Sequence, residues 1–492
     1  MRERECDVVL AGGRVIDPET GWDGIAHVGI TGSQITDFAT GQVPHARTII
    51  DVSGRVVAPG WIDVHSHAQT VMGARLQARD GVTTALDLEG GVSNVAACYE
   101  RASAEGRPIH FGFSASWQQA RMIEVASFEL PGELDHALAH FGDMQWQRSA
   151  SKKLQHRLYS RLERDLEEGA LGIGLLVGYA PGVDPQELLD VSRIAAQSQT
   201  ATYTHARDLV EFKPDIVIDG AEEIVRAAQE TGVQSHYCHI HSTSLWHVER
   251  VHNLLERAGT SISTEAYPYG AASTAISASF LAPERLAERR LHPRSILLTP
   301  SGRILQSVDE LRELRRDDPG AIVVVHYLDE EVPADAEVLL RALTYPGAVV
   351  GSDAMPLGSR GSGQDPYEWP PPANTAVHPR NAGTFSRFIR RYVRELASFT
   401  LLDAVEKCTL LPAKMLESFT PVMASKGRVQ VGCDADLVVF DFDRLTDRAT
   451  YRRGAEPSTG YEYVFVAGEI VVKHDELIID AFPGKPIRSR TA

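Results

Sequence analysis

The hydrophobic positions of the chain are grouped in short runs, and its two ends share a pattern that the middle lacks. From residue 6 to about 57 the runs are rich in β-branched residues and are broken by Gly and Asp, as in CDVVLAGGRVID and TIIDVSGRVV. The last part, from about 427, repeats this pattern in DLVVFDFD and YEYVFVAGEIVVK. Such runs are typical of short β-strands. We therefore predict a small β-sandwich domain built from residues 1–57 together with 420–492.

The middle of the chain, residues 58–419, alternates between apolar runs and amphipathic stretches of helical period, such as 185–198 and 219–231. Strands that alternate with helices predict a parallel sheet. Eight of them predict an α/β fold of the closed (β/α)8 type, a TIM-like barrel. The eight predicted strands lie at 56–67, 81–91, 110–116, 171–179, 201–207, 235–242, 261–269 and 348–354.

Two long connections interrupt this alternation. The stretch between the seventh and eighth strands, about 275–347, is too long for one connection, so we predict an insertion with its own strand at 322–328. After the eighth strand, residues 358–380 are rich in Gly and Pro, which predicts a long loop. Long loops on a rigid scaffold often carry functional residues.

Composition excludes several classes of protein. Of the 492 residues, 43% are hydrophobic and 23% are charged, which argues against a disordered chain. The formal net charge of -17 argues against nucleic acid or an anionic membrane as a partner. We find no apolar run of the roughly 18 residues that a membrane span needs, and we expect no signal peptide. The five scattered cysteines include no CxxC pair, which favours a cytoplasmic location.

Polar side chains that bind metals stand where the predicted barrel strands end. His65 and His67 end the first strand and share one face, because alternate residues of a strand point the same way. His205 ends the fifth strand, His239 lies in the sixth, and Asp353 ends the eighth. A barrel brings such ends together around one axis. Four imidazoles and a carboxylate suit zinc, manganese or iron, so we predict a metal site there.

The sequence also resembles the amidohydrolase superfamily over nearly its whole length. Within the superfamily it is most similar to the N-acyl-D-amino-acid deacylases, or D-aminoacylase group. The segment HPRNAGTFSR is the most specific part of the resemblance, because this group carries an HPR…GTF run after the aspartate of strand eight. The other matching segments are VAPGWIDVHSH, GVTT, GLLVGYAPG, YTHARD, GVQSHYCHIH, EAYPYGAAST and VVGSDAMP.

The resemblance implies a metal-dependent hydrolase of a non-peptide C–N bond, with an N-acyl-D-amino acid or a related small N-acyl compound as its substrate. His65 and His67 would hold one ion, and His205 and His239 a second. Asp353 would contact a metal-bound water and act first as general base and then as general acid. We expect zinc, one ion or two, with manganese or iron as alternatives. The expected substrate-binding residues are Tyr179, His241, Ser273, His378 and Arg380.

The sequence departs from the D-aminoacylase group at the bridge between the two ions. The group usually places a cysteine after strand two, and here Gly90 occupies that position. A modified lysine on strand four is also excluded as the bridge, because residues 171–179 contain no lysine. We predict Glu89 as the bridging ligand, with Asp87 as the second choice. A site for a single ion, without Glu89 as a ligand, is the alternative.

A second departure concerns recognition of the substrate. The group commonly has a lysine two residues after the histidine of strand six, and here this residue is His241, which is shorter and only partly charged near neutral pH. Arg380 remains suited to a carboxylate. Two alternatives stay open at this point: a cyclic amide hydrolase of the dihydroorotase or hydantoinase type, and a non-catalytic barrel that binds a ligand. Barrels of this kind often self-associate, so a homo-oligomer is also expected.

Overall fold

The computed structural model describes residues 5–490 except 133, 260–261, 358–364, 366 and 373–374. Much of the loop predicted at 358–380 therefore lies outside the described residues. Within the described part of the chain, eight parallel strands form a nearly closed barrel in the order β17-β12-β11-β10-β9-β8-β7-β6. Each of the eight coincides with a predicted run, so the barrel prediction is confirmed. The strands are β6 (Trp61–Asp63), β7 (Val82–Val92), β8 (His110–Ser116), β9 (Ile173–Leu175), β10 (Ala201–Thr204), β11 (Gln234–Tyr237), β12 (Ile262–Ala266) and β17 (Ala348–Val350).

The barrel closes between its first and last strands, just past their carboxyl ends. The backbone N–H of Asp353 donates to the carbonyl of His65 at 2.7 Å, and that of His67 donates to the carbonyl of Ala354 at 2.8 Å. Closer to the two strands, the hydroxyl of Ser352 donates to a carboxylate oxygen of Asp63 at 2.5 Å. The residues that join the two strands are thus the predicted ligands and their immediate neighbours.

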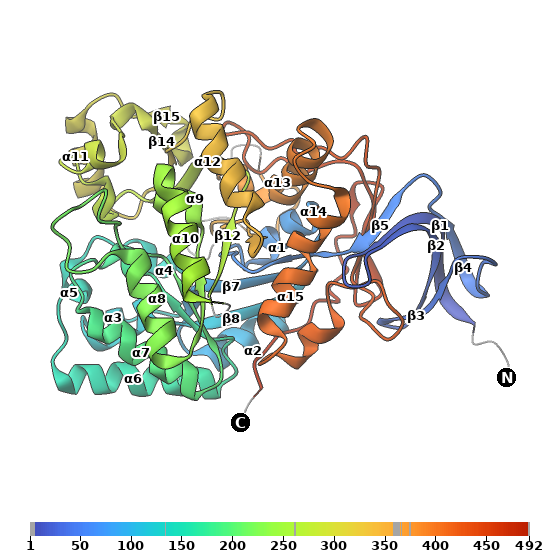
Figure 1. Ribbon diagram of the computed structural model, residues 1–492, viewed down its shortest axis with the longest axis horizontal. Coiled ribbons are helices and arrows are strands. Elements are labelled where there is room, and N and C mark those ends of the chain that lie inside the picture. Colours follow the sequence, from blue (N-terminus) through green and yellow to red (C-terminus); the bar gives the residue numbers. More distant parts are fainter. Residues whose placement is uncertain are drawn as a thin grey trace.

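Helices cover the outside of the barrel, and several of them begin at residues that suit a helix N-terminus (Figure 1). In α8 (Gly220–Thr231) the side chain of Asp219 accepts hydrogen bonds from the first backbone N–H groups, and Gly232 ends the helix with φ 72°. In α7 (Pro185–Gln197) Asp184 has the same role and is followed by proline. The longer helices of the remaining wall are α1 (Val71–Ala78), α2 (Val95–Glu105), α3 (Trp117–Glu124), α6 (Lys152–Glu167), α10 (Val248–Ala258), α12 (Pro333–Thr344), α13 (Arg380–Arg387), α14 (Leu401–Cys408) and α15 (Leu410–Leu416).

Both ends of the chain form one separate mixed sheet, as predicted. Its order is β21-β20-β19-β18-β5-β1-β2-β3, with β4 paired to β1. Figure 1 shows the blue N-terminal strands at one end of the molecule, beside the barrel. Apolar residues from both termini, among them Val15, Val28 and Leu437, pack in one core. The strands are β1 (Cys6–Asp17), β2 (Trp22–Thr31), β3 (Gln34–Ala39), β4 (Ala46–Asp51), β5 (Val56–Pro59), β18 (Leu437–Phe440), β19 (Tyr461–Val466), β20 (Glu469–Lys473) and β21 (Glu476–Leu477).

The segment between β12 and β17 contains a small antiparallel sheet of its own. The sheet has the order β13-β16-β14-β15 and consists of β13 (Ala271–Ala275), β14 (Ile296–Leu298), β15 (Arg303–Ile304) and β16 (Ile322–His326). Strand β16 matches the strand predicted within the insertion. The helix α11 (Val308–Asp317) connects β15 to β16. No helix of the described residues is long and apolar enough to cross a membrane.

Candidate metal centre and active site

The predicted metal ligands meet at the carboxyl ends of the barrel strands, around one buried point. Nε2 of His65 lies 3.2 Å from Nε2 of His67. Across the barrel, Nδ1 of His205 lies 3.1 Å from Nε2 of His239. In each pair two ring nitrogens point at the same spot, which is the arrangement of two imidazoles that share an ion. The structure thus forms the two pairs that the sequence analysis assigned to two ions.

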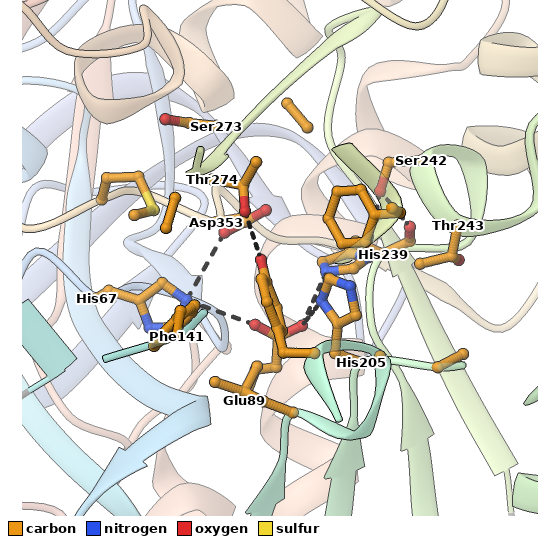
Figure 2. A pocket seen from close by; sticks show the side chains of 18 of the residues that line it. His67, Glu89, Phe141, His205, His239, Ser242, Thr243, Ser273, Thr274 and Asp353 are labelled. Atoms are coloured by element: carbon orange, nitrogen blue, oxygen red, sulfur yellow. Dashed lines mark hydrogen bonds and ion pairs between the residues drawn. The ribbon is translucent and has the colours of Figure 1, made fainter. Parts of the chain in front are cut away.

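Glu89 lies between His67 on one side and His205 and His239 on the other (Figure 2). Its Oε2 is 3.1 Å from Nε2 of His65 and 3.6 Å from Nε2 of His67. Its Oε1 is 3.1 Å from Nδ1 of His205 and 2.8 Å from Nε2 of His239. Burial raises the pKa of this carboxyl, but the nearby histidines together lower it by more, so the pKa lies well below its usual range. A charged carboxylate with one oxygen toward each pair has the geometry of a bridging ligand.

Asp353 completes the His65 and His67 side of the cluster. Its Oδ1 lies 3.5 Å from Nε2 of His65 and 3.7 Å from Nε2 of His67, while its Oδ2 accepts a hydrogen bond from Nη2 of Arg380 at 2.9 Å. Asp353 and His239 both have left-handed backbone conformations, with φ 50° and 63°. Such conformations are uncommon for residues with a side chain and concentrate at functional sites, where the surroundings hold them.

The donor set fits one or two divalent ions. Three groups among the described residues meet the geometric requirement, with ligand atoms within 4.8 Å of one another. Two of them form the centre, His65 with His67, Glu89 and Asp353, and Glu89 with His205 and His239; the third is His65 with Cys238 and Glu265. Imidazole nitrogens and carboxylate oxygens are ligands of zinc, manganese and iron. The alternative bridge, Asp87, does not lie between the pairs.

Two acids behind the first histidine pair were not predicted in that position. Asp87 accepts a hydrogen bond from Nδ1 of His67 at 2.9 Å and another from the backbone N–H of Gly91 at 2.9 Å. Glu265 of β12 accepts a hydrogen bond from Nδ1 of His65. Carboxylates behind metal-binding histidines fix the ring tautomer and strengthen the ligand. The position of Glu265 at the end of a predicted strand was the signal that could have found it.

All of these ligands except His65 line a cavity with a volume of about 780 Å³, its open mouth included. Tyr179 and Ser273, two of the predicted substrate-binding residues, belong to its wall. The hydroxyl of Tyr179 is 2.8 Å from that of Thr274, and burial raises the pKa of Tyr179 well above its usual range. The Ser273 hydroxyl donates to the carbonyl of Val323 at 3.2 Å. The larger apolar residues of its lining are Leu134, Leu138, Phe141, Leu176, Phe280 and Met355.

The other three predicted substrate-binding residues, His241, His378 and Arg380, do not line this cavity. His241 is buried with its ring edge-on to Tyr267, at a centroid distance of 4.2 Å. Burial, helped by His239 and Arg380, lowers the pKa of His241 to about 3, so the ring is neutral. His378 is fully buried, with Nε2 3.0 Å from the carbonyl of Ala271, and its Nδ1 accepts a hydrogen bond from the backbone N–H of Arg380 at 3.0 Å. Neither placement favours contact with a substrate.

Arg380 lies behind the cavity wall, between Asp353 and the backbone of Ser273. Its Nη2 is 2.9 Å from Oδ2 of Asp353 and 3.5 Å from the carbonyl of Ser273. Its other guanidinium nitrogens, Nε and Nη1, are buried and have no hydrogen-bond partner among the described residues. The ring of Tyr267 lies 4.7 Å from the guanidinium carbon. The predicted carboxylate-binding group is therefore near the metal ligands, with donors to spare.

Comparison with known proteins agrees with this geometry. A family model described as the amidohydrolase family matches residues 77–472. The chain belongs to the amidohydrolase family. The resemblance and the enzyme class inferred from the motifs, a metal-dependent hydrolase of non-peptide amide bonds, are thereby confirmed.

Individual relatives match almost end to end. The N-acyl-D-glutamate deacylase of Alcaligenes xylosoxydans xylosoxydans is 29% identical, over 95% of this chain and 93% of the relative. The D-aminoacylase of the same organism is 28% identical, over 94% of this chain and 93% of the relative. The solved N-acyl-D-glutamate deacylase of Bordetella bronchiseptica, complexed with zinc and a phosphonate inhibitor, is 25% identical with a TM-score of 0.77 and covers 99% of this chain and 100% of its own. A dihydroorotase match, by contrast, spans only 23% of this amidohydrolase.

Proposed function

We propose that this amidohydrolase is a zinc-dependent deacylase of N-acyl-D-amino acids. The observation that carries the proposal is the position of Glu89, whose two oxygens face the two histidine pairs beside Asp353. In this proposal His65 and His67 would hold one ion, His205 and His239 would hold the other, and Glu89 would be a ligand to both. Zinc is supported by the solved relative, which was complexed with zinc.

A bound divalent ion supplies water of lowered pKa and polarises the acyl carbonyl. The protein supplies the rest of the reaction. Oδ1 of Asp353 takes a proton from the attacking water, and later delivers it to the nitrogen of the leaving amine as the C–N bond breaks. Arg380 holds Oδ2 through its hydrogen bond at 2.9 Å, which leaves Oδ1 directed toward the histidines. Tyr179 is placed on the cavity wall to donate to the acyl oxygen as negative charge develops there.

The residues that line the cavity suit a substrate with an apolar part. Its apolar lining residues, among them Phe141 and Phe280, suit the side chain or the acyl group of the substrate. The prediction that Arg380 binds the α-carboxylate stays untested: a guanidinium suits a carboxylate, but this side chain is buried and does not line the cavity. The prediction that His241 and His378 touch the substrate stays untested, and their placement outside the cavity gives it no support.

The test is hydrolysis of a panel that includes N-acetyl and N-formyl derivatives of D- and L-amino acids, dihydrouracil and hydantoin. We expect turnover of D-derivatives and none of the cyclic amides. Turnover confined to the cyclic amides would establish the alternative hydrolase. No turnover of any amide by metal-loaded protein would favour a non-catalytic barrel.

The variant Asp353→Asn tests the mechanism. The amide keeps the size of the side chain but cannot accept the proton, so we expect kcat to fall by about 10²- to 10⁴-fold. Metal content and the melting temperature should stay near those of the parent. Full turnover by this variant would refute the role of Asp353.

Three further predictions, on the binding partner, the cellular location and self-association, belong to the same proposal. The partner is a small N-acyl compound that the cavity can hold. All five cysteines are free, which supports the cytoplasm as the compartment. We expect self-association only because barrels of this kind often form oligomers, and sedimentation velocity tests it.

A further inference from the structure

His378 is fully buried just before helix α13, and both of its ring nitrogens make hydrogen bonds to the backbone. Nδ1 accepts a hydrogen bond from the backbone N–H of Arg380 at 3.0 Å, so this nitrogen carries no proton. The proton is therefore on Nε2, which donates to the carbonyl of Ala271 at 3.0 Å. Burial, helped by Arg380, lowers the pKa of His378 well below its usual range, which agrees with a neutral ring.

The contact at Nδ1 fixes the start of α13. The first backbone N–H groups of a helix have no partner within the helix, and His378 satisfies that of Arg380. The next residue, Asn381, exchanges two hydrogen bonds with the backbone of Met355, at 2.7 and 3.2 Å. From this fixed start Nη2 of Arg380 reaches Oδ2 of Asp353 at 2.9 Å. The start of α13 thus determines where the guanidinium meets the catalytic carboxylate.

The contact at Nε2 holds the cavity wall. Its acceptor is the first residue of β13, a strand of the small antiparallel sheet rather than of the barrel. Further along β13, the carbonyl of Ser273 lies 3.5 Å from Nη2 of Arg380. The hydroxyl of Thr274 lies 2.8 Å from that of Tyr179, and both residues line the cavity. His378 therefore joins the helix that carries Arg380 to the strand that forms part of the wall.

Two tyrosine rings hold His378 from the sides. The rings of Tyr269 and Tyr451 both lie at a centroid distance of 5.2 Å, with interplanar angles of 87° and 90°. His378 itself does not line the cavity. The imidazole is thus fixed in one orientation, in which it serves the backbone on both sides and not a substrate.

We propose that His378 is a positioning residue for Asp353. It holds the start of α13 so that Arg380 keeps Oδ2 of Asp353 in place and Oδ1 stays directed toward the metal ligands. Proton transfer requires such placement, since a shift of about 1 Å in a reacting group can cost about 10²-fold in rate. The inference rests on the role of Asp353 in the proposed function and adds the residue that maintains its orientation.

Crystal structures of the full-length parent and of His378→Phe test the placement without any substrate. Phenylalanine keeps a ring but neither accepts nor donates a hydrogen bond. We expect Nη2 of Arg380 to move out of hydrogen-bond distance of Oδ2 of Asp353. An unchanged contact would overturn the proposal whether or not the parent hydrolyses an amide. A lost contact in a protein whose parent hydrolyses no amide would refute the proposed function but not the positioning of Asp353.

Steady-state kinetics show which of the two contacts matters for turnover. In His378→Phe we expect kcat to fall by about 10- to 100-fold with KM unchanged, because the residue does not touch the substrate. His378→Asn places its amide oxygen the same number of bonds from Cα as Nδ1, so it can accept from Arg380 and should restore most of kcat. His378→Gln places its amide nitrogen like Nε2 and should not. The two variants also serve if His378→Phe does not fold, and rescue by glutamine alone would overturn the path through Arg380.

The matched control is Ser386→Ala, on the same helix. Ser386 is buried, and its hydroxyl donates to Asp80 at the other end of α13, away from Arg380. The control should lower the melting temperature and leave kcat per folded chain at the parental value. If Ser386→Ala lowers kcat as much as His378→Phe does, the loss reflects general packing of the helix, and the proposed role of His378 is refuted.

Discussion

Replacing Glu89 by glutamine removes the one group that faces both histidine pairs. The amide keeps one oxygen for one pair, but it presents an NH₂ group to the other and carries no charge. The ligand atoms of each half lie within 4.8 Å of one another. An ion held among them would lie nearer than that to the lost charge, at most about 4 Å away. Two unit charges about 4 Å apart interact by about 4 kcal/mol at an effective dielectric constant of about 20. Since 1.4 kcal/mol is tenfold in affinity, we expect a loss of about 10³-fold for each ion.

The measurement is metal content and affinity. Parent and Glu89→Gln proteins are dialysed against the same buffered free Zn²⁺ and analysed for zinc per chain, and stripped samples are then titrated by calorimetry. The parent should retain two ions and the variant at most one. Thermal unfolding of both stripped proteins is the control, because a general loss of structure would lower stability without metal. Two ions bound at parental affinity would show that Glu89 is not the bridge.

Two further predictions concern Gly90 and Lys407. In Gly90→Ala the new Cβ would lie 3.0 Å from two ring atoms of His67; we expect a loss of about 1–3 kcal/mol in urea unfolding and weaker metal binding, and unchanged values would contradict the geometry. Burial lowers the pKa of Lys407 to about 8 from 10.5, so the unfolded chain binds more protons between these values. Stability should therefore rise by about 3 kcal/mol from pH 8 to 10.5 relative to Lys407→Met, and parallel profiles for the two proteins would refute this.

The barrel could be predicted because each of its strands is a separate, strongly patterned run. Parallel strands buried on both faces give continuous apolar segments, and their carboxyl ends carry the polar residues of the site. Four histidines and Asp353 therefore came together in the structure as the order of the strands required. Family resemblance added the pairing of these histidines, which strand order alone does not give.

The outer contacts of the site could not be predicted in the same way. Asp87 and Glu89 are alternate residues of one strand and point to the same side, so the pattern alone does not say which reaches between the histidine pairs. In the structure Asp87 lies two residues further from the carboxyl end of the strand than Glu89. Its carboxylate contacts Nδ1 of His67, on the side of the ring away from the other ligands. Glu265 is 200 residues from His65, and such a contact depends on the register of distant strands.

His241 shows the limit of reasoning from aligned positions. It lies where relatives of the D-aminoacylase group place a lysine, but it follows the sixth strand inside the short helix α9 (Ile240–Ser244). A long lysine can extend from such a position toward a cavity, whereas the shorter imidazole packs on Tyr267 instead. The position matches the group, but the length of the side chain changes what it can reach.

The closure of the barrel has a consequence for how the protein tolerates change. The bonds that join the first strand to the eighth belong to residues that neighbour or include His65, His67 and Asp353. Loss of this junction would separate the ligands on the first strand from Asp353. The closure of the barrel and the binding of metal therefore depend on the same few residues. A substitution at this junction must preserve both the hydrogen bonds that close the barrel and the positions of the metal ligands. A substitution on a distant strand need not meet both requirements.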